Sequence, residues 1–237
     1  MLILGIGLLL SGSALAQSPQ PAPVWQSLKV LETVEPIYPH RLLEVAVVRG
    51  EARVAISVDA TGKLEELLVV GYTDREFADA AVSAIKEWKF EPARLRGEPV
   101  GATTELLFNF ETRGTVVSSV TIADMIEAQY RRILDGRYVY RPCTLPELDR
   151  IPLPLVTVQP RYSTQLAEQG VKGRVTIEFF IDENGAVRMP TGSAEDNSQL
   201  TALAIDAVAK WKFEPPTSRG LKVLVRASQV FNFANGG

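Results

Sequence analysis

The sequence is poor in the residues that enzyme chemistry most often uses. Its 237 residues include one cysteine, Cys143, and one histidine, His40. A single cysteine allows no intramolecular disulfide, and a single histidine provides neither a zinc cluster nor a Cys/His pair. His40 has no serine-containing elbow nearby for a Ser-His-Asp set, and no glycine-rich phosphate loop follows residue 16. We therefore expect a protein that is not an enzyme and that uses no cofactor and no metal.

An excess of charge of one sign is also lacking. The formal net charge is −3 at pH 7, with 46% hydrophobic and 22% charged residues. This balance is typical of a globular protein and gives no indication of a nucleic-acid or anionic-membrane partner. The length allows one large domain or two smaller ones, each able to bury a core.

The N-terminus carries an apolar run, LILGIGLLL, at residues 2–10. It is shorter than the about 20 residues that a membrane-spanning helix needs. Ala14-Leu15-Ala16 fits the small-x-small pattern of a signal-peptidase site. We predict a signal peptide at residues 1–16, export to the periplasm, and a proline-containing leader at residues 17–33. No Lys or Arg precedes the run, so its retention as an inner-membrane anchor stays open.

The pentapeptide WKFEP occurs twice, at residues 88–92 and 211–215. At the same offset of 123 positions, sixteen residues of the segment 50–110 are identical in the second copy. We therefore predict two copies of one domain, at residues 34–111 and 151–234. A partly helical connector at residues 112–150, with its apolar stripe at 122–134, would join them.

Both copies show the same order of hydrophobic patterns. A short helical stretch is followed by a strand with period-two alternation, a turn with Asp and Gly, a second strand, an amphipathic helix and a last strand. The predicted fold class is α+β, with two copies of a small α-β-β-α-β unit whose three-stranded antiparallel sheet packs on helices. The last strands are predicted at residues 102–110 and 223–233. Such a small sheet must leave edges exposed.

The WKFEP residues are interpreted as structural. In this interpretation the tryptophan ends the apolar stripe of the helix, the phenylalanine continues into the core and the proline stops the helix. The residues concerned are Trp88, Phe90, Pro92, Trp211, Phe213 and Pro215.

The ordered motifs resemble the TonB C-terminal domain family. The opening P-I-Y-P at residues 36–39, the D-x-x-G turn at 59–62, WKFEP and F-N-F at 108–110 carry the resemblance in the first copy. The second copy adds Q-P-R-Y at 159–162 and a G-x-V strand start. It departs from the pattern at Ser163, which replaces the second proline of the opening motif.

The resemblance implies a periplasmic domain that grips the N-terminal "TonB box" of an outer-membrane transporter as an added β-strand. It assigns the last strand of each copy to that contact, through Thr104, Leu106, Val223, Val225 and Ala227. It assigns the opening motifs to contacts with the transporter, through Gln159, Pro160, Arg161, Tyr162, Pro36 and Tyr38.

Three functions remain open from the sequence. The first is an exported interaction module that binds an extended peptide or envelope partner, linked to TonB-dependent transport. The second is a membrane-anchored energy transducer coupled to an inner-membrane motor complex, although the leader at 17–33 reaches only about 50 Å even as polyproline II. The third is a structural module whose sheet edges pair with each other, within the chain or in a homodimer, and leave no peptide site.

Overall fold

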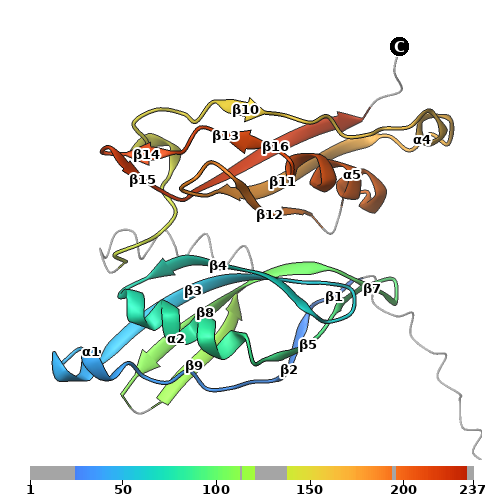
Figure 1. Ribbon diagram of the computed structural model, residues 1–237. Coiled ribbons are helices and arrows are strands. Elements are labelled where there is room, and N and C mark those ends of the chain that lie inside the picture. Colours follow the sequence, from blue (N-terminus) through green and yellow to red (C-terminus); the bar gives the residue numbers. More distant parts are fainter. Residues whose placement is uncertain (1–24, 113, 121–137, 194–195, 234–237) are drawn as a thin grey trace, which may run out of the picture.

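A computed structural model describes residues 25–112, 114–120, 138–193 and 196–233 (Figure 1). The predicted signal peptide, most of the leader and the predicted connector helix at 122–134 lie outside these residues. Within the described ranges, no helix is both long enough and apolar enough to cross a membrane.

The first domain is a four-stranded antiparallel sheet with helices on one face. The central sheet has the strand order β4-β3-β8-β9. Its elements, with the short leader and hairpin strands, are β1 (Trp25–Gln26), β2 (Lys29–Glu32), α1 (His40–Glu44), β3 (Arg49–Val58), β4 (Leu64–Tyr72), α2 (Arg75–Ile85), β5 (Lys89–Glu91), β6 (Ala93–Leu95), β7 (Glu98–Val100), β8 (Ala102–Glu111) and β9 (Gly114–Val120). The prediction of three strands is wrong for this domain, because β9 from the predicted connector pairs antiparallel with β8.

The second domain has a three-stranded antiparallel sheet with the order β12-β11-β16. Its elements are the 3-10 helix η1 (Leu145–Glu147), β10 (Pro154–Val156), α4 (Thr164–Glu168), β11 (Gly173–Ile181), β12 (Val187–Gly192), α5 (Ser198–Val208), β13 (Lys212–Phe213), β14 (Thr217–Ser218), β15 (Leu221–Lys222) and β16 (Val225–Phe233). Small antiparallel sheets and separate helices confirm the α+β class.

The main helices begin at side-chain caps and pack on the sheets. Asp74 accepts a hydrogen bond from the backbone N–H of Glu76, and Asn197 accepts from Gln199 and Leu200, which satisfies free donors of the first helical turn. Phe77 of α2 is fully buried against the first sheet, as Leu200 of α5 is against the second. Each domain therefore has its own core between helix and sheet.

The WKFEP segments lie against the turn between the first two strands of each sheet. Gly62 and Gly185 adopt φ values of +88° and +80°, and a Cβ there would lie 2.5 Å from the Phe90 carbonyl oxygen and 2.0 Å from that of Phe213. The helices end at Ile85 and Val208, three residues before each tryptophan. The prediction that the proline stops the helix is therefore wrong, because each helix has already ended before the tryptophan.

The two tryptophans instead tie each domain's first segment to its core. Trp88 donates through Nε1 to the Val34 carbonyl at 2.9 Å, and Trp211 donates to the Val158 carbonyl at 2.8 Å. Both rings are almost completely buried. The interpretation of WKFEP as structural stays a prediction, and these two hydrogen bonds give the tryptophans structural partners that the sequence did not indicate.

The two domains pack through the sheet faces that α2 and α5 do not cover, one above the other in Figure 1. An apolar cluster joins them, and its members are Ala55, Leu68, Val70, Phe180, Met189 and Leu224, with Tyr140 packed against it. The ion pairs Arg226–Glu105, at 3.5 Å, and Arg188–Glu66 link the domains beside this cluster. The domain pair thus forms one body with a shared interface.

Candidate functional site

The outer edge of β16 exposes backbone hydrogen-bonding groups. β16 pairs on one side with β11, where Val225 lies opposite Ile181 and Phe233 opposite Gly173. The Thr176 N–H donates to the Asp196 carboxylate and therefore points away from β16. Because the direction alternates along a strand, the odd-numbered residues of β11 direct their backbone N–H and C=O groups toward β16. In an antiparallel pair, opposed residues that exchange both backbone hydrogen bonds alternate with opposed residues whose backbone groups point away from the partner strand. The outward residues of β16 are Arg226, Ser228, Val230 and Asn232.

The connector covers the beginning of this edge. Cys143 forms a parallel bridge with Val225, and its N–H donates to the Leu224 carbonyl at 2.8 Å. Burial raises the pKa of the Cys143 thiol above its usual value, with a further contribution from the Glu147 carboxylate, so the thiol stays neutral. Beyond this bridge, no strand among the described residues pairs with the outer edge of β16.

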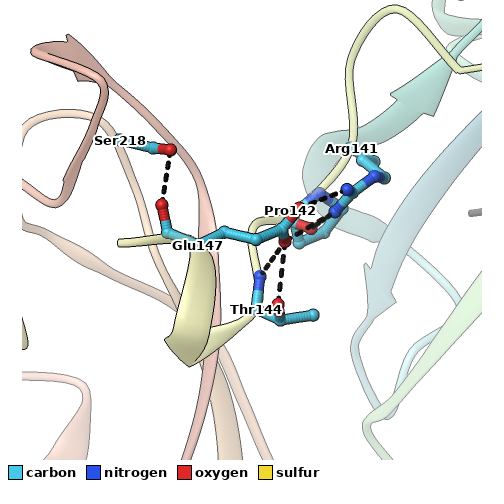
Figure 2. A network of polar contacts seen from close by, with 5 residues as sticks. All are labelled: Arg141, Pro142, Thr144, Glu147 and Ser218. Atoms are coloured by element: carbon cyan, nitrogen blue, oxygen red, sulfur yellow. Dashed lines mark hydrogen bonds and ion pairs between the residues drawn. The ribbon is translucent and has the colours of Figure 1, made fainter. Parts of the chain in front are cut away.

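A polar network around Glu147 fixes the connector where it reaches β16 (Figure 2). The Arg141 guanidinium donates to both Glu147 oxygens, at 2.9 Å and 2.5 Å, and the Thr144 N–H and hydroxyl each donate at 2.8 Å. The Ser218 hydroxyl of β14 donates to the Glu147 backbone carbonyl at 2.6 Å. The Arg141 hydrogen bonds, followed by those from Thr144, lower the pKa of Glu147 to about 2. The carboxylate is therefore ionised at neutral pH, and the connector is held at the start of the edge.

The side chains along the edge include one buried ion-pair network and two exposed polar groups. The Arg226 guanidinium lies over the Phe180 ring, 5.0 Å from its centre, and reaches Glu105 of the first domain. Burial raises the pKa of Glu105, and the Arg53 and Arg226 guanidinium groups oppose that rise. Ser228 and Asn232 are exposed. The edge is accessible from Ser228 onward.

The residues predicted to bind a partner in the last strand of the second domain alternate with the residues whose backbone groups point outward. The Val223 N–H donates to the Pro216 carbonyl, while Val225 and Ala227 direct their backbone groups toward β11. The predicted strand therefore has an open edge, but its outward hydrogen-bonding groups belong to the intervening residues.

The predicted residues of the first domain do not lie on an open edge. Leu106 is buried in the core, and Thr104 pairs with Ile56 of β3. Strand β9 lies along the other side of β8 and pairs with residues 105–111. The prediction of an exposed edge at residues 102–110 is wrong over this stretch, because a segment of the same chain occupies it.

The opening motifs lie close to the ends of the last strands. The Tyr38 and Tyr162 hydroxyls donate to the Val47 and Val171 carbonyls, each at 2.7 Å, so both have structural partners. The Tyr162 ring packs on Phe233 at 5.4 Å between centres. This contact places the segment 159–162 at the far end of β16.

The exposure of the opening motifs differs between the domains. Gln159 and Arg161 are exposed and Pro160 is half-buried, whereas Pro36 is buried. The second domain therefore combines an accessible opening motif with an open last strand. Their use in binding remains a prediction.

Comparison with known proteins identifies two matching segments. The family described as Gram-negative bacterial TonB protein C-terminal matches residues 34–112 and 158–234. The chain is similar to Protein TonB of Xanthomonas campestris pv. campestris, with 34% identity over 76 residues, which are 32% of this chain and 34% of that protein. It is 30% identical over 80 residues to Protein TonB of Vibrio cholerae serotype O1, covering 33% of each. The matches thus span about a third of the length of these curated relatives.

Proposed function

The chain belongs to the family of Gram-negative bacterial TonB protein C-terminal domains, and from that premise we propose that it binds an extended segment of an outer-membrane receptor. The bound segment adds a strand to the second domain at the outer edge of β16. The protein acts in the periplasm as an interaction module linked to TonB-dependent transport.

The open edge of β16 carries this proposal. Beyond the bridge to Cys143, Ser228 and Asn232 direct N–H and C=O groups outward, spaced as a pairing strand requires. Val230 adds an outward N–H, while its carbonyl accepts a hydrogen bond from the Gln229 side-chain amide at 2.8 Å. An edge of this kind is a template for β-augmentation, in which main-chain hydrogen bonds supply affinity and side-chain contacts supply specificity. The exposed Gln159 and Arg161, beside the far end of the strand, supply such side-chain contacts.

Two other functions are compatible with the same family. An anchored energy transducer would use the same edge and add a mechanical link through the N-terminal segment. A structural module would leave no free edge, and the pairing of β9 with β8 favours this for the first domain alone. The open edge of β16 favours binding in the second.

Proline at Ser228 tests the edge directly. Ser228→Pro removes one outward N–H from an exposed position where an edge strand tolerates proline. We expect binding of a synthetic TonB-box peptide, from a transporter of the same bacterium, to weaken up to about tenfold, because the hydrogen bond to that N–H is lost. Isothermal titration calorimetry measures the change.

The matched control is Ser228→Ala, which keeps the backbone N–H and removes the same hydroxyl. Its affinity is expected to equal that of the parent chain. Equal affinity of Ser228→Pro and the parent, with unchanged circular dichroism, would exclude this edge as the peptide site.

A further inference from the structure

We propose that β9 is a built-in occupant of the first domain's binding edge, so that each chain presents a single peptide edge, at β16. This inference rests on the proposed function and concerns its stoichiometry. It predicts that two domains of the same family, in one chain, are not equivalent binding sites.

The pairing of the two sheets matches residue by residue. In the first sheet Val58 lies opposite Ala102 and Gly50 opposite Phe110. In the second, Ile181 lies opposite Val225 and Gly173 opposite Phe233, at the offset of 123 positions found in the sequence. The outer edge of β8 is therefore the counterpart of the outer edge of β16.

Strand β9 uses the hydrogen-bonding groups that β16 leaves open. The Thr73 N–H, just after β4, donates to the Glu51 carbonyl, and the Glu51 N–H donates to the Thr73 hydroxyl. The backbone groups of Glu51 therefore point toward β4, and those of the even-numbered residues of β3 point toward β8. The odd-numbered residues of β8 then face β9, with Leu107 opposite Ser118 and Asn109 opposite Val116. At the same offset, Leu107 and Asn109 correspond to Val230 and Asn232. The β9 backbone thus lies where a bound peptide would lie on the second domain.

The covalent connection gives β9 an advantage over any separate peptide. In the sequence only residues 112 and 113 lie between β8 and β9, so the pairing is intramolecular and the connection is short. A short connection of this kind gives an effective concentration in the millimolar range or above. A receptor segment at micromolar concentration therefore does not displace β9 from β8. At the open edge of β16, the same segment has no strand to displace.

Opening the first edge by substitution tests the inference in the full chain. Val116→Pro with Ser118→Pro removes two β9 donors to β8. The matched control, Val117→Pro with Ser119→Pro, places the same two prolines at positions whose N–H groups point away from β8. Calorimetry with the synthetic TonB-box peptide counts the peptides bound per chain, and amide exchange at Leu107 and Asn109 reports whether the edge has opened.

The expected result is one peptide bound to the parent and control chains, and two to the Val116→Pro/Ser118→Pro chain. One peptide on all three chains would overturn the inference and leave the proposed function intact. No peptide on the parent but one on the opened chain would support the role of β9 and overturn binding at β16. No binding to any chain would overturn both, and continued protection of Leu107 and Asn109 would overturn the role of β9.

Discussion

Replacing Glu105 with alanine is expected to lower the free energy of unfolding by about 3–5 kcal/mol, because it leaves a buried cation without its counter-ion. The Arg53 and Glu105 side chains are each only 6% exposed and lie 3.3 Å apart at the domain interface. Among the residues that the structure describes, the Nε and Nη2 atoms of Arg53 have no hydrogen-bond partner, so Glu105 provides its main compensation, beside the Tyr138 ring 5.8 Å away. Urea denaturation followed by tryptophan fluorescence measures the change.

The control for this prediction removes both charges together. Arg53→Met with Glu105→Leu replaces the pair by apolar groups, which is expected to leave the free energy of unfolding unchanged or to raise it by about 1–4 kcal/mol. Arg226 also loses Glu105 in this variant, but its half-exposed side chain can reach water. A Glu105→Ala variant as stable as the parent would show that this pair is not desolvated in solution.

Gly185→Ala is expected to lower the stability by about 4 kcal/mol, near the upper end for single substitutions. The residue adopts φ of +80°, which costs a non-glycine residue about 1 kcal/mol or more. The larger contribution is steric, since the new Cβ would lie 2.0 Å from the Phe213 carbonyl oxygen and 2.9 Å from its carbon. Backbone atoms cannot move aside as a flexible side chain can, so the turn or the WKFEP segment must shift.

Gly220 serves as a control that separates the conformational contribution from the steric one. Its φ of +75° is similar, but no atom of the described part of the chain lies within 4 Å of the position of its Cβ. Gly220→Ala is therefore expected to cost only the conformational term of about 1 kcal/mol. Thermal unfolding of both variants measures the difference, and equal effects would contradict the close contact between the turn and Phe213.

The main elements of the fold could be predicted from the sequence because their patterns are local. Period-two alternation located β3 and β11, and the apolar stripes located α2 and α5 close to their observed bounds. The sequence does not predict strand β9, because the apolar stripe at residues 122–134 favours a helix in the connector. The β-branched residues Thr115, Val116 and Val117 are the signal that could have indicated a strand there.

The domain interface could not be predicted because it depends on contacts between distant segments. Arg53 and Glu105 alternate with core residues and are therefore expected on a solvent-facing side of the sheet. The second domain carried a useful signal, since Phe179, Phe180 and Ile181 form a continuous apolar run, as in a strand covered on both faces. This run alone does not show which surface covers the second face of the strand, since that surface belongs to the first domain.

The candidate site in the second domain stays a prediction, and the structure differs from the sequence in which residues of the strand direct their backbone groups outward. Residues whose side chains face the core, such as Ala227, direct their backbone groups toward β11. The intervening residues direct them outward, and this assignment needs the pairing partner as well as the pattern. Ser228 and Asn232 were therefore missed, together with Cys143, which covers the start of the edge.

Amide hydrogen exchange by NMR, with and without the TonB-box peptide, tests the central claim most directly. In the free chain, we expect fast exchange at Ser228, Val230 and Asn232, and slow exchange at Leu107 and Asn109, which β9 covers. Peptide binding should protect the three β16 amides and leave the two β8 amides unchanged. Unchanged exchange along β16 at saturating peptide would contradict the account.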